Sequence, residues 1–269
     1  WHRPVLDFSN PKVREYFAAN LVWWVKEFDV DGFRCDVAGG SPTSFWEQAR
    51  DELDKVKPDV LMLAEADMPE HQWKAFDISY NFTYHAALVK VVHDGEPATL
   101  IREQWERMHA FMPRGARMLH YSDNQDQGRS VLSNGGRADM AMTALNATLD
   151  GIPFLYNGQE IWDTMPTDSG KLNPIRWQLL AERGWVFDAY RKLFELRLRE
   201  PALTSGELIW VANSEPASVL SFLRRKGKDE VLVMVNLSSR KVSGTVELPV
   251  ADYCPLYDIY RGERIGYRM

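Results

Sequence analysis

A regular alternation of amphipathic and apolar segments through the first two hundred residues constrains the fold more than any other feature of this sequence. Apolar residues recur at helical spacing over residues 11–28, where Pro11 suits the first turn of a helix. A short apolar run at 30–38 follows, and the same pair of patterns repeats at 41–57 and 59–66. Near-continuous apolar strands separated by helices predict a parallel sheet covered by helices.

The alternation continues as far as a long amphipathic helix at 185–200 and then stops. Before that helix we expect two helices between 85 and 111, a helix at 135–151, and strands at 75–82, 116–123 and 152–158. After Pro201 the pattern becomes short strands separated by Gly, Lys and Ser turns, at 206–213, 218–225, 230–238 and 242–249. We therefore predict two domains, residues 1–203 and an antiparallel β domain at residues 204–269.

The composition is that of a soluble globular protein and argues against several classes of function. The chain has 269 residues, a formal charge of −6 and no Lys/Arg cluster, so we expect no nucleic-acid partner. Its longest apolar run, LVWWV, is too short to cross a bilayer, so we expect no membrane segment. Cys35 and Cys254 form no metal-binding or redox spacing, and neither a metal site nor a dinucleotide fingerprint is predicted.

Three of the predicted strands end at or just before a carboxylate, namely Asp36, Glu65 and Asp126. In a parallel barrel the residues that perform chemistry lie at the carboxyl ends of strands. One acid that closes an apolar strand is usually structural, but three on separate strands indicate an acid/base site. Arg34 lies two residues before Asp36, so both side chains point to the same face and the guanidinium keeps that carboxylate ionised. Glu65, in a drier position, can stay protonated and donate a proton.

Two carboxylates with opposite roles are what glycoside hydrolysis requires, and the motifs around them resemble those of the α-amylase superfamily. DGFRCD (31–36) resembles the nucleophile motif, LAEA (63–66) the general-acid motif and SDNQDQ (122–127) the third-carboxylate motif. DFSNPKVR and GIPFLYNGQEI also resemble the family, so the resemblance covers nearly the whole chain. It implies an α/β fold: the C-terminal part, about strands 4–8, of a TIM (β/α)8 barrel, followed by a small antiparallel β-sandwich domain.

The resemblance implies a retaining glycoside hydrolase that cleaves α-1,4-glucosidic bonds in starch, maltodextrin or related α-glucans. In that reaction Asp36 is the nucleophile that forms a glycosyl-enzyme intermediate, and Glu65 is the general acid and base. Asp126 hydrogen-bonds the hydroxyls of the distorted sugar ring. Two alternatives stay open: a transglycosylase with the same chemistry, and a catalytically inactive amylase-like domain used for binding.

The same resemblance makes four residues candidates for substrate binding, namely Arg34, Asn124, Gln125 and Arg129. The family's third motif reads Asn-His-Asp, whereas Gln125 stands here in the place of the histidine. A glutamine amide also donates hydrogen bonds but has a different reach and no charge, so the effect on activity is open. Arg129 matches an arginine that holds the neighbouring sugar in many relatives, and a structural salt bridge in the loop is an equal alternative.

The family's first motif and its first three strands have no counterpart in this chain, so we expect a chain truncated at its N-terminus. We predict no cofactor for the residues present, and calcium only through ligands in the missing part. An open edge on a parallel sheet leads us to expect low stability and no activity for the isolated piece. The resemblance favours a periplasmic or secreted location, with an α-glucan or oligosaccharide as the binding partner.

Overall fold

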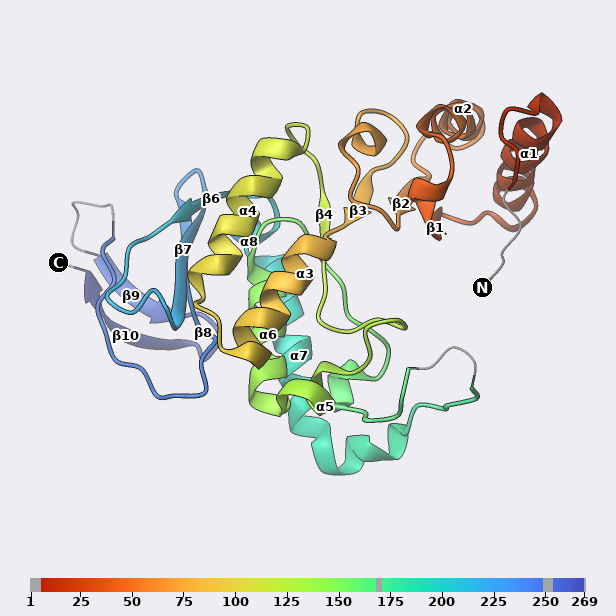
Figure 1. Ribbon diagram of the computed structural model, residues 1–269. Coiled ribbons are helices and arrows are strands. Elements are labelled where there is room, and N and C mark those ends of the chain that lie inside the picture. The colour runs from red at the N-terminus through yellow and green to blue at the C-terminus, as the bar shows by residue number, and fades with distance from the viewer. Residues whose placement is uncertain (1–5, 168–170, 249–253, 269) are drawn as a thin grey trace. The chain divides into compact units, whose positions relative to one another are not determined.

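The computed structural model describes residues 6–167, 171–248 and 254–268. The chain divides into two compact units, a first unit of residues 1–83 and 105–119 and a second unit of residues 84–104 and 120–269. The first unit contains α1 (Pro11–Phe28), β1 (Gly32–Cys35), α2 (Thr43–Asp54), β2 (Leu61–Ala64), β3 (Ile78–Tyr80), most of β4 (Met118–His120) and 3-10 helices at Ala38–Gly40 and Pro69–Gln72 (Figure 1).

The first helix begins where the sequence predicts. Its cap is the side chain of Asn10, which accepts a hydrogen bond from the backbone N–H of Lys12 at 3.0 Å. It ends because Asp29 adopts a left-handed conformation, from which the Asp29 N–H donates to the Val25 carbonyl. α1 lies beside α2 (Figure 1), and the apolar faces of both helices share one core with β1 and β2.

The first unit is organised around a parallel sheet, as predicted. β1 pairs with β2, β2 with β3 and β3 with β4, all in parallel. The register sets Cys35 opposite Ala64 and Ala64 opposite Ser79, so β1, β2 and β3 end at nearly the same level. Gly32 is required where β1 approaches β2, because a Cβ atom there would lie 2.3 Å from the Leu61 carbonyl oxygen.

The second unit holds the remaining elements: α3 (Phe82–Val89), a π-helical segment (Lys90–Asp94), α5 (Ser130–Asn134), α6 (Gly136–Thr148), β5 (Ile152–Pro153), α7 (Leu180–Arg199), α8 (Pro201–Ser205), β6 (Glu207–Trp210), β7 (Val219–Lys226), β8 (Asp229–Asn236), β9 (Cys254–Asp258), β10 (Glu263–Arg268) and 3-10 helices at Gln159–Ile161 and Trp177–Leu179. α4 (Thr99–Phe111) contributes residues to both units, and α3 begins in the first. Within this unit the Phe154 N–H, directly after β5, donates to the His120 carbonyl at 2.8 Å.

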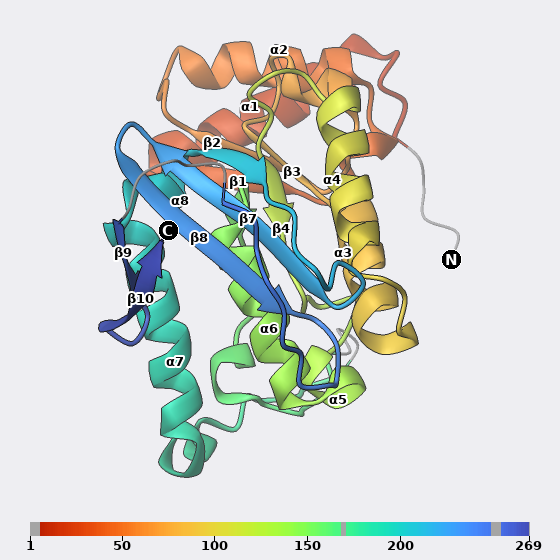
Figure 2. The ribbon, with the colours of Figure 1, turned by 90° about the vertical axis from the view of Figure 1, so that its left-hand side faces the viewer.

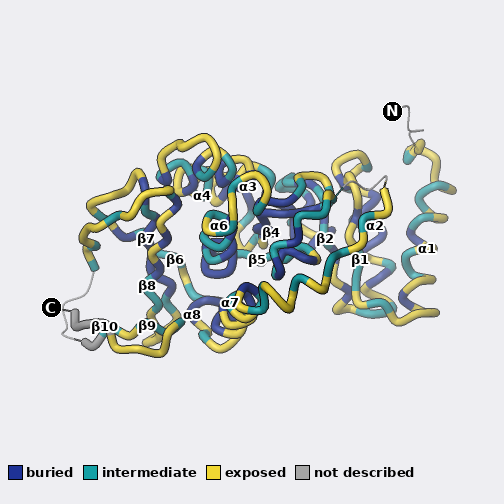
Figure 3. The backbone as a smooth tube through the Cα atoms, turned by 90° about the horizontal axis from the view of Figure 1, so that it is seen from below, coloured by how far each residue is buried: buried dark blue, intermediate teal, exposed yellow. Residues whose placement is uncertain are grey.

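The C-terminal strands form two antiparallel sheets in the second unit. β7 lies between β6 and β8, and β9 pairs with β10. β7 is largely buried (Figure 3), and its Arg224 donates to the Thr148 carbonyl at 2.7 Å and to the Gly206 carbonyl at 2.9 Å. The β9–β10 hairpin lies beside α7 (Figure 2), where the Tyr260 hydroxyl donates to the Ala189 carbonyl at 3.3 Å.

The α/β class and the parallel sheet are confirmed, whereas barrel closure, a sandwich arrangement of the C-terminal strands and a domain boundary at 203/204 stay predictions. In the parts of the chain that the structure describes, no helix combines the length and apolar character needed to span a bilayer.

Two predicted strands differ from the structure. The strand expected at 152–158 is only two residues long, because the chain turns back after it, with the Gln159 N–H donating to the Tyr156 carbonyl and the Asp163 N–H to the Gly158 carbonyl. The strand expected at 242–249 is absent from its described part, 242–248, where Val246 makes an isolated bridge to Asn213. The last residue of that predicted strand lies outside the described residues.

Candidate active site

Arg34, Asp36 and Glu65 come together at the ends of β1 and β2 in the first unit. The Nη1 atom of Arg34 lies 2.8 Å from Oδ1 of Asp36, and its Nη2 atom lies 2.7 Å from Oε1 of Glu65. Side chains alternate along β1, so the intervening Cys35 is buried in the core. The parallel pairing continues past β1, where the Glu65 N–H donates to the Cys35 carbonyl at 3.0 Å. One guanidinium therefore faces both the predicted nucleophile and the predicted acid.

The two carboxylates lie in different surroundings. The side chain of Asp36 is 63% exposed, whereas that of Glu65 is 12% exposed. Burial raises the pKa of Glu65; the Val37 N–H and the Arg34 charge oppose the rise, and the nearby Asp36 carboxylate adds to it. Burial works against the charge of Arg34, but hydrogen bonds to Tyr80 and Asp36 raise its pKa above the usual range. An accessible carboxylate beside a drier one is the contrast that acid/base chemistry needs.

Val37 adopts a left-handed backbone conformation directly after Asp36, with φ 46° and ψ 46°. For an L-residue this region costs about 1–2 kcal/mol, and β-branched residues are rare there. The Val37 N–H donates to Oε2 of Glu65 at 2.8 Å, so the unusual backbone supplies a second donor to the predicted acid. Sequence reasoning missed this contact, because a valine carries none of the residue signals that mark a left-handed turn.

The third predicted motif forms a tight turn in the second unit. Asn124 is buried, and its Oδ1 atom accepts the N–H groups of Asp126 at 2.8 Å and Gln127 at 2.7 Å. Gly128 closes the turn with φ 81°. The Gln125 amide donates to Oδ2 of Asp126 at 2.6 Å, and the side chain of Asp126 is exposed to solvent. The structure therefore brings Asn124, Gln125 and Asp126 together, and the Gln125 amide is hydrogen-bonded to the Asp126 carboxylate.

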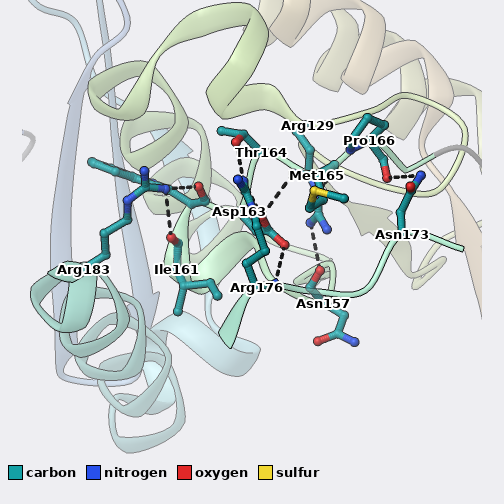
Figure 4. Close-up of polar contacts among 11 residues, drawn as sticks. Arg129, Asn157, Ile161, Asp163, Thr164, Met165, Pro166, Asn173, Arg176 and Arg183 are labelled. Carbon is teal, nitrogen blue, oxygen red and sulfur yellow. Dashed lines mark hydrogen bonds and ion pairs between the residues drawn. The ribbon is translucent and has the colours of Figure 1, made fainter. Parts of the chain in front are cut away.

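Arg129 is buried and its partners lie in the segment after β5 (Figure 4). Its Nη1 atom donates to the Asn157 carbonyl at 2.8 Å, and its Nε atom donates to the Met165 carbonyl at 3.2 Å. The guanidinium also lies 4.9 Å from the centre of the Tyr156 ring. Of the two interpretations of Arg129, these contacts favour a structural role, with carbonyl oxygens as partners in place of a carboxylate.

The segment that Arg129 holds is also fixed from within (Figure 4). Asp163 is fully buried, and its Oδ1 atom accepts hydrogen bonds from Arg176 Nε at 2.8 Å and from the Met165 N–H at 3.1 Å. Its Oδ2 atom accepts the Arg176 N–H at 3.1 Å. Burial alone would raise the pKa of Asp163, but these donors, with Arg176 foremost, hold it below its usual value.

Asp139, in the first turn of α6, is a fully buried acid that sequence reasoning did not select. Its carboxylate accepts hydrogen bonds from the hydroxyls of Ser130 and Tyr190, from Trp162 Nε1 at 2.8 Å and from Gln159 Nε2 at 3.3 Å. Burial raises the pKa of Asp139, and all four donors oppose that rise. Because Ser130 directly follows the turn that carries Asp126, its hydrogen bond to Asp139 links the turn to the buried interior.

Both ends of the turn are tied to the same buried network. Gln159 also donates to Oγ of Ser122 at 2.8 Å, and the Ser130 N–H donates to Oδ1 of Asp123 at 2.9 Å. Burial, followed by the charge of Asp139, raises the pKa of Asp123 to about 6. The exposed carboxylate of Asp126 therefore stands on a loop whose two ends are buried and hydrogen-bonded.

Within residues 6–167, 171–248 and 254–268, no group of three or more His, Cys, Asp or Glu side chains is arranged so that it could hold a metal ion.

Comparison with known proteins places these motifs in a family. Residues 2–231 match the family model described as "Alpha amylase, catalytic domain". Neopullulanase 2 from Thermoactinomyces vulgaris is 27% identical, over 97% of this chain and 46% of that protein. A cyclomaltodextrinase from Thermoanaerobacter pseudethanolicus is 27% identical, over 90% of this chain and 43% of that protein. The crystal structure of a maltogenic α-amylase from Thermotoga neapolitana matches with a TM-score of 0.86 at 29% identity, over 97% of this chain and 62% of that chain. This chain thus spans less than half the length of these two curated relatives.

Proposed function

This chain belongs to the α-amylase family, and we propose that it supplies the catalytic carboxylates of a retaining glycoside hydrolase that cleaves α-1,4-glucosidic bonds in starch, maltodextrin or related α-glucans. The names of its relatives, a neopullulanase and a cyclomaltodextrinase, support an α-glucan substrate. The observation that carries the proposal is the sharing of one Arg34 guanidinium by Asp36 and Glu65. Retaining glycosidases need two carboxyl groups close to one glycosidic bond, with opposite protonation states.

In the first step Asp36 attacks the anomeric carbon. An O–C bond forms to the Asp36 carboxylate while the glycosidic C–O bond breaks, and Glu65 gives its proton to the departing oxygen. Arg34 Nη1, 2.8 Å from Oδ1 of Asp36, stabilises the negative charge that this attack needs, and the 63% exposure of Asp36 leaves it accessible to a sugar. Burial raises the pKa of Glu65, which favours the protonated form that the step requires.

In the second step water replaces the enzyme on the sugar. The ionised Glu65 takes a proton from the water, whose oxygen attacks the anomeric carbon and releases Asp36. Arg34 Nη2 and the Val37 N–H both donate to Glu65, so its anionic form between the two steps has two hydrogen-bond donors. Because these two donors stabilise the anion while burial favours the protonated form, Glu65 can act as an acid in the first step and as a base in the second.

Asp126 is the third carboxylate of the proposal and binds hydroxyl groups of the distorted sugar ring. Its exposed position on a hydrogen-bonded turn supports this role. Gln125 donates to Asp126 and so orients that carboxylate; when its amide rotates toward a ligand it can donate to a sugar hydroxyl instead. Asn124 holds the turn through its Oδ1 atom and acts on the substrate through Asp126.

The proposal is tested with the natural-length protein that contains this chain. Incubation with maltotriose is followed by NMR of the anomeric protons, and we expect the α anomer as the first product, because two displacements at one carbon retain its configuration. Asp36→Asn should lower kcat by roughly 10³-fold or more, because the variant has no anionic nucleophile. A protein that releases no sugar from any α-glucan, or that releases the β anomer first, would refute the proposal.

Two alternatives share the fold and are separated by simple measurements. A transglycosylase makes oligosaccharides longer than the maltotriose supplied, which chromatography of the products detects. A catalytically inactive binding domain binds maltodextrin but gives no product, and its binding is unchanged by Asp36→Asn. The presence of all three carboxylates favours an enzyme over the inactive domain.

The remaining proposals rest on the family resemblance. We propose that β1 to β5 are five of the eight strands of a (β/α)8 barrel and that the C-terminal strands form a sandwich, which a crystal structure of the natural-length protein tests. A calcium site outside the described residues is tested by metal analysis of the purified protein. A periplasmic or secreted location is tested by cell fractionation.

A further inference from the structure

Tyr80 is a buried residue at the end of β3 that touches the candidate active site. Its side chain is only 1% exposed, and its hydroxyl oxygen accepts a hydrogen bond from Arg34 Nε at 3.1 Å. The guanidinium carbon of Arg34 also lies 5.5 Å from the centre of the Tyr80 ring. A side chain this deeply buried is not available for stacking on a sugar ring.

The sheet explains why Tyr80 reaches Arg34. β2 lies between β1 and β3, and the register sets Ala64 opposite both Cys35 and Ser79. The residues that follow these positions are therefore at one level across three neighbouring strand ends. β1 contributes the arginine and the predicted nucleophile, β2 the predicted acid, and β3 the tyrosine.

The three side-chain nitrogen atoms of Arg34 each contact a different residue. Nη1 donates to Asp36, Nη2 to Glu65 and Nε to Tyr80. A guanidinium group is planar and rigid, so a fixed Nε sets the direction of the two terminal nitrogens. The side chain of Arg34 is about one-third exposed, so packing alone does not hold it. Of these three partners, the tyrosine is the uncharged one, and it comes from a fully buried position.

We propose that Tyr80 is a positioning residue for the proposed glycosidase reaction, and that its hydroxyl aims the Arg34 guanidinium at Asp36 and Glu65 together. The proposal rests on the function proposed above for those two carboxylates. The Tyr80 hydroxyl acts through Arg34 and need not touch the substrate. Its loss therefore affects the chemical step more than the binding of the glucan.

Tyr80→Phe tests this role by removing a single oxygen atom while the ring remains. Tyr84→Phe is the matched control, because Tyr84 is also 1% exposed and its hydroxyl donates to Asn146 in the second unit at 2.7 Å. In the natural-length protein, Tyr80→Phe should lower kcat about 10-fold to 100-fold with little change in KM, since a hydrogen bond to a charged group is lost. Tyr84→Phe should leave kcat near the wild-type value when both variants are assayed well below their unfolding temperatures.

A second measurement does not depend on enzyme activity. Carboxyl groups are titrated by ¹³C NMR in the natural-length protein. The groups that face Glu65 are Arg34, Asp36 and the Val37 N–H. A less well-held Arg34 stabilises the Glu65 anion less, so Tyr80→Phe should raise the pKa of Glu65 by about half a unit or more. Tyr84→Phe should not change it. A wild-type protein without glucan activity would refute the proposed function, while the titration would still test the link between Tyr80 and Arg34.

A double-mutant cycle separates positioning from general stability. Arg34→Lys has no Nε donor, so adding Tyr80→Phe to it should cause little further loss of kcat or change in the Glu65 titration. The proposal is overturned if the two substitutions have additive effects, if Tyr80→Phe leaves both kcat and the Glu65 titration unchanged, or if Tyr84→Phe has the same effects as Tyr80→Phe.

Discussion

Asp139 offers a sharp test of how the turn that carries Asp126 is supported. Asp139→Ala removes a buried acceptor of four hydrogen bonds, which come from the hydroxyls of Ser130 and Tyr190, the indole N–H of Trp162 and the side-chain amide of Gln159. Each buried donor that loses its partner costs about 1–3 kcal/mol, and breaking a buried charged network costs about 3–5 kcal/mol. We therefore expect a loss of about 3–5 kcal/mol in the free energy of unfolding.

Urea unfolding of the natural-length protein, followed by far-UV circular dichroism, measures this loss. The control is Asp188→Ala in α7, where the side chain is two-thirds exposed and forms a surface ion pair with Arg191. This substitution should change the free energy of unfolding by less than about 0.5 kcal/mol. Asp139→Asn keeps the side-chain volume and one acceptor, so its cost should fall between those of the two alanine variants. A loss below about 1 kcal/mol for Asp139→Ala would refute the view that its four hydrogen bonds hold this region.

The same network should control the order of the turn. Ser130→Ala cuts the link between Asp139 and the loop, and hydrogen exchange of the Asp126 and Gln127 amides should become faster as the loop loses support. Ser221→Ala is the matched control, since Ser221 is similarly buried and donates to a carbonyl oxygen in the distant β6–β7 region of the same unit. Equal exchange in both variants would show that the turn is held by Asn124 alone.

Three further predictions concern stability. Burial raises the pKa of Asp123 from 3.8 to about 6, so the protonated form adds about 3 kcal/mol of stability below about pH 4, and this contribution is lost as the pH rises through about 6. Asp123→Asn should flatten that loss in urea unfolding measured between about pH 4 and 7. An unchanged pH profile would show that Asp123 does not titrate in this range. Val37→Gly should stabilise the chain by about 0.5–1 kcal/mol, because glycine adopts the left-handed region without strain, and Val37→Ala should stabilise it less; a destabilised glycine variant would contradict this. Arg129→Lys should lower the free energy of unfolding by about 2 kcal/mol, because the hydrogen bonds of Arg129 to two carbonyl oxygens are lost. Unchanged thermal unfolding together with weakened glucan binding would instead support a substrate-binding role for Arg129.

The regular elements could be predicted because their signals are local. The start of α1 follows from Asn10 and Pro11, and the strands that lead to Asp36 and Glu65 follow from apolar runs of the right length. The grouping of Arg34 with these two acids could be anticipated as well, since neighbouring parallel strands end at the same edge. The first two inferences need only a few adjacent residues, and the third needs only the parallel pairing of two consecutive strands.

What could not be predicted depends on partners far away in the chain. Asp139 reads as a surface acid in the first turn of a helix until Ser130 and Tyr190 are placed beside it. Tyr80 reads as an ordinary core aromatic, and Val37 gives no sign of its left-handed backbone. The β9–β10 hairpin was missed because its strands are short and lack a regular alternation of apolar and polar residues.

The central claim is that Asp36 is the nucleophile of a retaining glycosidase, and trapping the covalent intermediate tests it most directly. The natural-length protein is incubated with 5-fluoro-α-D-glucosyl fluoride, whose ring fluorine slows the second step more than the first, and is then digested and analysed by mass spectrometry. We predict one fluoroglucosyl group per protein, attached to the peptide that contains Asp36, and no label in Asp36→Asn. An active protein that carries the label on another carboxylate, or that is never labelled while it releases fluoride, would contradict the account.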